Sequence, residues 1–137
     1  MLEQIQLYLL GLPAFFSYFA IGGILLLLFI TLYNGLTPLN EWELVKQDDL
    51  AAAVAFSGSL MGFVVPLVSA IANAQSNVDC ILWGVVALIV QLTAFFVVRM
   101  FLPRLAERIK EGEVSAGIVL AAISLSVGMI NAASMTF

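Results

Sequence analysis

The polar side chains that could do chemistry in this sequence stand inside long apolar stretches. They are one glutamine, three serines and one asparagine, and none of them has a charged residue close by in the sequence. These five residues are Ser57, Ser59, Gln91, Ser126 and Asn131. Surrounded by hydrocarbon, amides and hydroxyls are costly unless they bond to another helix or line a polar path. We therefore treat these five residues as a candidate polar pathway, with hydrogen bonding between helices as the alternative.

The chain lacks the groups that most enzymes need. It has no histidine, and Cys80 is its one cysteine, so neither a zinc cluster nor a histidine base can be assembled. No Asp, Glu, Lys or Arg lies deep inside an apolar stretch, which disfavours proton-coupled carriers and voltage sensors. Nine acidic residues outnumber five basic ones, which disfavours nucleic-acid binding. We expect no enzymatic activity, cofactor, metal or nucleic-acid partner.

The apolar stretches themselves predict membrane-spanning helices. Of the 137 residues, 63% are hydrophobic and 10% charged, more apolar surface than a soluble fold of this size can hide. A helix needs about 20 apolar residues to cross the hydrocarbon. Four stretches meet that length, at residues 14–33, 50–74, 80–101 and 114–137. The predicted fold class is all-α, a polytopic membrane protein with four transmembrane helices.

Residues 1–13 are predicted as a separate N-terminal segment. Pro13 stands just before the first predicted span, and proline inside a helix removes a hydrogen bond and tends to break it. No Lys or Arg precedes the apolar run, as a cleaved signal peptide would require. We therefore expect this segment to be retained and to face outward.

Charged residues gather in two of the three connections between the helices. Residues 75–79 form a short turn, whereas residues 38–50 and 103–113 resemble amphipathic segments lying on the membrane surface. All five Lys and Arg residues lie in or beside these two segments, and basic loops stay on the cytoplasmic side. Both segments are thus predicted to be cytoplasmic and both termini periplasmic, with Trp42 and Arg99 as interfacial anchors.

A weak internal repeat relates the two halves of the chain. Shifting the sequence by 65 residues places Pro38 on Pro103 and Ser59 on Ser124. Each half then has a helix, a charged segment and a helix rich in small residues. Residues 14–74 and 75–137 are therefore predicted as two parallel helical-hairpin repeats, with chance similarity between apolar regions as the alternative.

The last helix of each half carries a stripe of small residues. Small side chains let helix backbones approach closely in lipid, so the stripes predict helix packing within one chain or between copies. The residues predicted to pack helices are Gly58, Gly62, Gly117, Ser124 and Gly128. The alternative is that serines in these stripes, with Asn131, line a polar path.

Three segments carry a resemblance to a known family. The segments PLNEWEL from Pro38, AVAFSGSLMG from Ala53 and GMINAASMTF from Gly128 are similar to those of the YjfL-like uncharacterised bacterial inner-membrane proteins. That family consists of tandem copies of a two-helix domain of unknown function (DUF350), and the resemblance covers essentially the whole chain. It implies a bacterial cytoplasmic membrane and, from gene neighbourhoods, a link to membrane-stress systems, but no catalytic or binding residues.

The paired charged segments and paired small-residue stripes favour a non-enzymatic role. We expect a homo-oligomeric scaffold or anchor in the lipid bilayer that presents residues 38–50 and 103–113 to a cytosolic protein. Solvated helix faces would look the same in sequence. The alternative function is a small oligomeric channel or uncoupled transporter lined by the candidate polar pathway together with Ser124.

Overall fold

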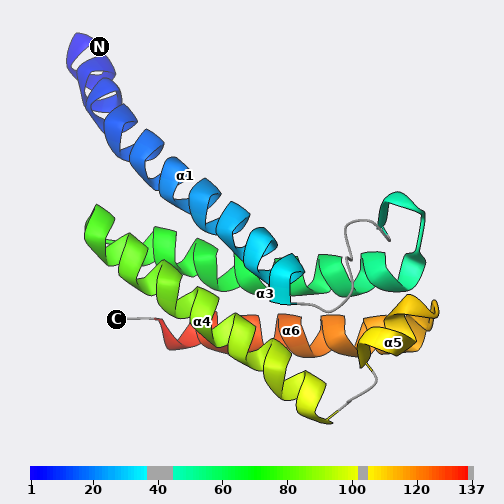
Figure 1. Cartoon of the computed structure of the whole chain (residues 1–137). Coiled ribbons are helices and arrows are strands. Elements are labelled where there is room, and N and C mark those ends of the chain that lie inside the picture. Colours follow the sequence, from blue (N-terminus) through cyan, green and yellow to red (C-terminus); the bar gives the residue numbers. More distant parts are fainter. Residues whose placement is uncertain (37–44, 102–104, 136–137) are drawn as a thin grey trace.

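Helices make up nearly all of the computed structural model, which describes residues 1–36, 45–101 and 105–135. The helices are α1 (Leu2–Leu36), α3 (Leu50–Asn73), α4 (Asn77–Phe101), α5 (Leu105–Lys110) and α6 (Val114–Ser134), shown in Figure 1. The described ranges contain no strand. Helices α1, α3, α4 and α6 are long and apolar enough to cross a membrane, which confirms the predicted all-α, four-span fold.

The first helix begins twelve residues earlier than the predicted start at residue 14. It runs without interruption from Leu2 to Leu36, with Pro13 inside it, so residues 1–13 are not a separate segment. In hydrocarbon, leaving the helix exposes several unpaired backbone groups, which costs more than the one hydrogen bond that proline removes. At 1.5 Å per residue the helix is about 52 Å long, against about 30 Å of hydrocarbon.

The other three long helices begin and end close to their predicted bounds. Asp49 caps the start of α3, where the backbone N–H of Ala52 donates to its Oδ1 at 3.0 Å. The connection between α3 and α4 is shorter than expected, because α4 already begins at Asn77. The Ser76 hydroxyl oxygen accepts from the backbone N–H of Asp79 at 3.1 Å, which satisfies one of the free donors at the start of α4.

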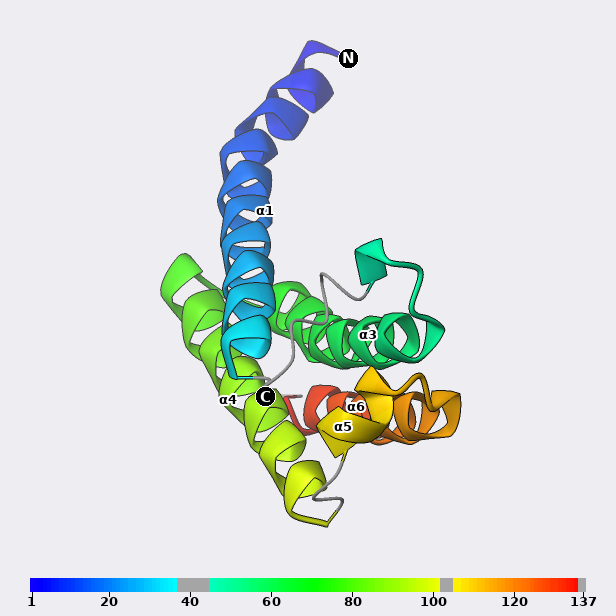
Figure 2. The same ribbon diagram turned by 45° about the vertical axis from the view of Figure 1, so that its right-hand side comes forward.

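Helices α3 and α6 lie side by side and run in the same direction, whereas α1 and α4 run the opposite way (Figures 1 and 2). The contact between α3 and α6 is the most extensive in the chain, α4 packs against both, and α1 packs against α3 and α4. Consequently the start of α1 and the end of α6 lie at one end of the bundle, and the starts of α3 and α6 lie at the other (Figure 1). That this first end faces the periplasm stays a prediction.

Aromatic rings fill the core where the second half of α1 meets the bundle. The rings of Phe29 and Phe63 stack with centroids 4.8 Å apart, and the ring of Tyr33 meets that of Phe95 edge-on at 5.0 Å. These contacts fix α1 to α3 and α4. By contrast, every residue from 2 to 16 is exposed, and this half of α1 points away from the bundle (Figures 1 and 2). We call residues 2–16 the arm.

Candidate functional site

Three polar side chains are buried inside the bundle, one each on α3, α4 and α6. They are Ser59, Gln91 and Ser124, with exposed fractions of 2%, 3% and 3%. Apart from Tyr33, no other side chain with a polar or charged N or O group in the described ranges is buried to this degree. Since buried polar groups need partners, the bonds of these three residues decide what the cluster can do.

Gln91 joins α4 to α6. Its side-chain Nε2 donates to the backbone oxygen of Ser124 at 2.9 Å, and a Cβ atom on Gly62 would lie 2.5 Å from the same nitrogen. The amide therefore fits only because position 62 has no side chain. Its Oε1 is buried and has no hydrogen-bond partner, which leaves one strong acceptor unused in the centre of the bundle.

Ser59 joins α3 to the inner half of α1. Its hydroxyl donates to the Oη of Tyr33 at 3.3 Å, and both groups are buried. The Tyr33 ring also meets Phe56 edge-on, with centroids 6.1 Å apart. Tyr33 was not among the predicted site residues, although a tyrosine at the end of an apolar run was a visible signal.

The predicted packing residues all lie in the contact between α3 and α6. A Cβ atom on Gly58 would collide with Ala121, one on Gly117 with the backbone of Ala51, and one on Gly128 with the backbone of Gly62. Gly62 in turn lies against Ser124. Such backbone contact gains dispersion energy, which is the main attraction between helices in lipid.

A side-chain hydrogen bond also crosses the contact between α3 and α6. The hydroxyl of Ser69 donates to the backbone oxygen of Ala132 at 3.1 Å. Ser69 and Ala132 are 63 positions apart, and Gly62 and Gly128 are 66 apart. The sequence separation of residues that meet across the two helices is therefore close to the predicted shift of 65. The two stripes therefore face each other at similar depth, while the repeat as a whole stays a prediction.

The five residues of the candidate polar pathway do not come together in one chain. Ser59 and Gln91 are buried, whereas Ser57 and Ser126 are exposed on the outer surface, and Ser126 donates to its own helix at Ala122. Asn131 is half-buried, and its Nδ2 has no partner. A path lined by all five would need several copies of the chain, and it stays a prediction.

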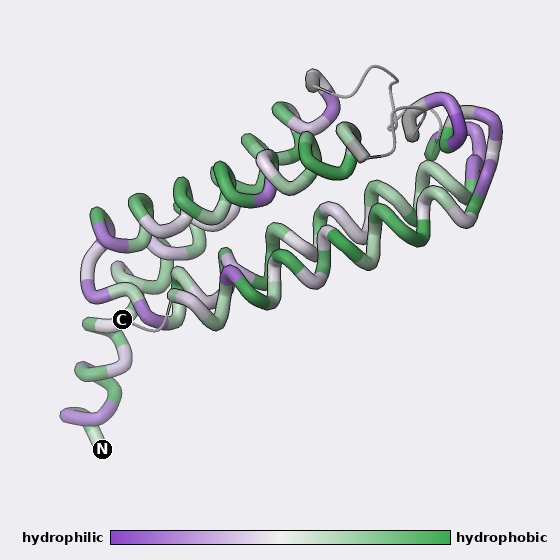
Figure 3. Tube along the Cα trace, turned by 90° about the horizontal axis from the view of Figure 1, so that it is seen from below, coloured by the Kyte–Doolittle hydropathy of each residue, from purple (hydrophilic) through white to green (hydrophobic). Residues whose placement is uncertain are grey.

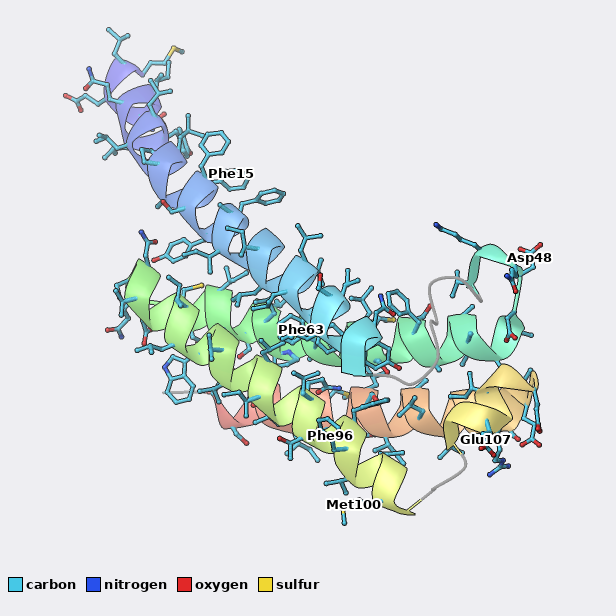
Figure 4. All side chains as sticks on the ribbon, in the orientation of Figure 1. Phe15, Asp48, Phe63, Phe96, Met100 and Glu107 are labelled. Atoms are coloured by element: carbon cyan, nitrogen blue, oxygen red, sulfur yellow. The ribbon has the colours of Figure 1, made fainter. Side chains whose placement is uncertain are left out.

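The charged end of the molecule is held in place by α5. Ile109 is 2% exposed, and α5 packs against both α3 and α6. Arg108 and Glu113 form an ion pair, and Gly112 closes the turn before α6 with a φ of +83°. Hydrophilic residues gather at this end (Figure 3), and Asp48 and Glu107 both lie there (Figure 4).

The predicted anchors and the single cysteine lie apart from the buried polar residues in the sequence. Trp42 lies outside the described residues, and for Arg99 only its position in α4 is described. Cys80 is fully buried at the start of α4. Within the described ranges, no group of three His, Cys, Asp or Glu side chains could hold a metal ion.

Known proteins resemble this chain over nearly its whole length. It is 44% identical over 127 residues to the UPF0719 inner membrane protein YjfL of Escherichia coli K12, covering 93% of this chain and 96% of YjfL. It is 25% identical over 121 residues to the UPF0719 transmembrane protein YshE of Bacillus subtilis 168, covering 87% of this chain and 90% of YshE. No solved structure matches.

The matching family model is the Domain of Unknown Function DUF350, over residues 6–135. Together with the inner-membrane relatives and the four apolar helices, this match confirms the predicted family and the multi-pass membrane class. The tandem arrangement of the domain stays a prediction. The chain is a multi-pass membrane protein that belongs to the DUF350 family.

Proposed function

We propose that the chain is a non-enzymatic, self-associating scaffold of the inner membrane that holds a cytosolic protein at its charged end. The observation that carries this proposal is that α5 is fixed to the bundle through the buried Ile109. A merely solvated connection needs no such anchor. A fixed segment presents its charges in one geometry, and preorganised surfaces lose less entropy on binding.

Exposed charged residues lie on both connections at this end. Lys46 and Asp48 are exposed before α3, and Glu107 and Glu111 are exposed on and after α5. The rule that basic loops stay inside supports placing this end in the cytoplasm. The family resemblance suggests membrane-stress proteins as the first partners to test.

The proposal is tested by neutralising this end without disturbing the bundle. The variant Lys46→Gln, Asp48→Asn, Glu107→Gln and Glu111→Gln leaves Ile109 and the Arg108–Glu113 pair intact. We expect a stoichiometric partner, recovered by cross-linking and gentle detergent extraction of the wild-type protein, to be lost from this variant. Glu3→Gln, at the opposite end, is the matched control and should retain it. Equal recovery with all three proteins would contradict the proposal.

A small channel or uncoupled transporter is the second candidate function. The unused Oε1 of Gln91 favours it, since a free acceptor in the core can serve a passing solute. The test is flux of ions and small neutral solutes through liposomes that contain the purified protein. A flux that exceeds that of empty liposomes and changes in the Gln91→Leu variant would support this candidate. A flux equal to that of empty liposomes for every solute would eliminate it.

A further inference from the structure

Helix α1 contacts the face of α4 that carries Gln91. The side chain of Leu25 lies against Gly84, and the ring of Tyr33 meets that of Phe95 with centroids 5.0 Å apart. At 100° per residue, Gln91 points within about 20° of Gly84 and within about 40° of Phe95. Gln91 therefore lies between two positions at which α1 touches α4.

Two buried acceptors remain without hydrogen-bond partners in this arrangement. The Gln91 side chain is 3% exposed, and its Oε1 has no partner. Asn34, in the last turn of α1, also has a buried Oδ1 without a partner. An unpartnered buried acceptor lowers stability, and in a folded protein it calls for an explanation. A second position of α1, in which a hydrogen-bond donor reaches Gln91, would relieve that cost.

Side-chain tips hold α1 on the bundle at its glycine contacts. A Cβ atom on Gly22 would meet the tip of Ile71, and one on Gly84 would meet the tip of Leu25, whereas the glycines between α3 and α6 meet backbone atoms. In the most apolar stretch of α1 only 11% of residues are buried, against 33% or more in those of α3, α4 and α6. Side-chain tips can change rotamer, and regions with few buried contacts open most readily. Helix α1 is therefore the membrane helix best placed to move.

We propose that the inner half of α1, residues 17–36, is a movable cover over a binding site for a neutral, hydrogen-bond-donating solute at Gln91. When the cover shifts away from α4, the solute enters from the side and donates to the Oε1 of Gln91. When the cover returns, the amide is buried again, as the structure shows it. This inference rests on the second candidate function, and it names the class of solute and its route.

The chemistry of the site selects the solute. The free atom of Gln91 is an acceptor, so it binds a donor such as a hydroxyl or an amide N–H. Within the described ranges no charged side chain is buried, and a charge without a partner is costly in hydrocarbon. Glycerol and urea, which are neutral donors, are therefore the probes, and choline is the charged control.

The test measures the distance between α1 and α3 by double electron–electron resonance of spin-labelled protein in lipid nanodiscs. Labels are attached to Leu27→Cys and Val68→Cys, because both positions are exposed on the outer surface. Cys80 is the one cysteine, so a Cys80→Ala background leaves only the introduced thiols. A second pair, Val68→Cys with Ile130→Cys, reports on the α3–α6 contact from exposed positions. We expect two distances for the first pair and one for the second.

Two substitutions should shift the share of the longer distance in opposite directions. Phe29→Ala removes the stacking on Phe63 that holds the cover, and it should raise that share about tenfold or more. Adding Gln91→Leu to Phe29→Ala removes the unpartnered acceptor, and it should lower the share about threefold or more. Phe15→Ala, on the exposed arm, is the matched control and should leave the share unchanged.

The probes test the solute directly. Glycerol and urea should raise the share of the longer distance as their concentration rises, because a ligand shifts a population toward the state that it binds. Neither probe should change the share in Gln91→Leu, and choline should change it in neither protein. A response to glycerol and urea that persists in Gln91→Leu would overturn the inference, and so would the absence of any response.

Two further outcomes would overturn the inference. A single distance between α1 and α3, in Phe29→Ala as in the wild-type protein, means that α1 is fixed. Two distances in both labelled pairs mean that the whole bundle is loose. The flux test separates this inference from the second candidate function: flux with a fixed α1 leaves that function standing without the cover, whereas a response that depends on Gln91 without flux leaves a binding site that does not conduct.

Discussion

The contact between α3 and α6 and the projecting arm of α1 are both rich in apolar residues but differ in what covers them. In the most apolar stretch of α3, 44% of residues are buried inside the chain, against 11% in that of α1. Small residues bring the backbones of α3 and α6 together at Gly62 and Gly128, whereas the arm carries large side chains that are exposed. In lipid, side-chain size and shape separate these regions, because apolarity alone gives no preference for protein over hydrocarbon.

The largest expected difference is between two phenylalanines, one buried in the bundle on α3 and one exposed on the arm. Phe63 is fully buried against Phe29, whereas Phe15 is 57% exposed on the arm. Phe63→Ala should cost about 3 kcal/mol, the lower end of the range for buried Phe→Ala changes, because in lipid only lost packing counts. Phe15→Ala should cost less than about 0.5 kcal/mol. The free energy of unfolding of both variants can be measured in mixed micelles. Equal losses would contradict the expected difference between the bundle and the arm.

A second test adds a side chain where two backbones touch. Gly62→Leu pushes into Ser124 and the Gln91 amide, whereas Gly23→Leu, on α1, meets nothing within 4 Å. The first change should cost about 1–3 kcal/mol or more through overpacking, and the second should be close to neutral. Comparable melting temperatures for the two variants would show that the α3–α6 contact is looser than its geometry indicates.

A third test asks how much the bundle around the α3–α6 contact depends on the hydrogen bond between α4 and α6. Gln91→Leu removes the bond to Ser124 but also removes an unpartnered acceptor. Hydrogen bonds between membrane helices are worth about 0.6 kcal/mol on average, so the net loss of unfolding free energy should stay below about 1 kcal/mol. Thr93→Val, on the exposed face of α4, is the control. A greater loss of unfolding free energy in Gln91→Leu than in Gly62→Leu would mean that this amide contributes more to stability than the glycine packing.

The smallest expected effect separates the two halves of α1. Tyr33→Phe removes the hydroxyl that accepts from Ser59 at 3.3 Å, and should cost about 0.5 kcal/mol. Tyr8→Phe, on the exposed arm, should change stability by less than the error of the measurement. The contrast is read from paired thermal melts in one detergent. A loss in Tyr8→Phe of the same size would indicate that the arm is packed against protein after all.

Prediction from the sequence succeeded where one physical constraint acted alone. Length and apolarity define a membrane helix, so α3, α4 and α6 begin and end near their predicted residues. Prediction failed at Pro13, where two constraints compete: proline disfavours a helix, but hydrocarbon penalises every unpaired backbone group more strongly. The start of α1 at Leu2 shows which constraint prevails.

The residues of the candidate site can also be divided into those that could be predicted from the sequence and those that could not. Spacing along one helix is enough to predict that Gly58, Gly62, Gly117, Ser124 and Gly128 share faces suited to packing. The depth of each polar residue and the direction in which it points could not be predicted in this way, because both depend on the neighbouring helices. Ser57 and Ser59 are two positions apart, yet one is exposed and the other is buried against Tyr33.

The sequence by itself determined the membrane class, the number of spans, the concentration of charge in two connections, and the family. These follow from local composition, since a run of apolar residues satisfies its backbone hydrogen bonds internally as a helix. Only the tertiary structure decided that α3 and α6 meet backbone to backbone, that Gln91 bonds to Ser124, and that the arm stands free. Those outcomes depend on how side chains from different helices fit together, which no single stretch of sequence contains.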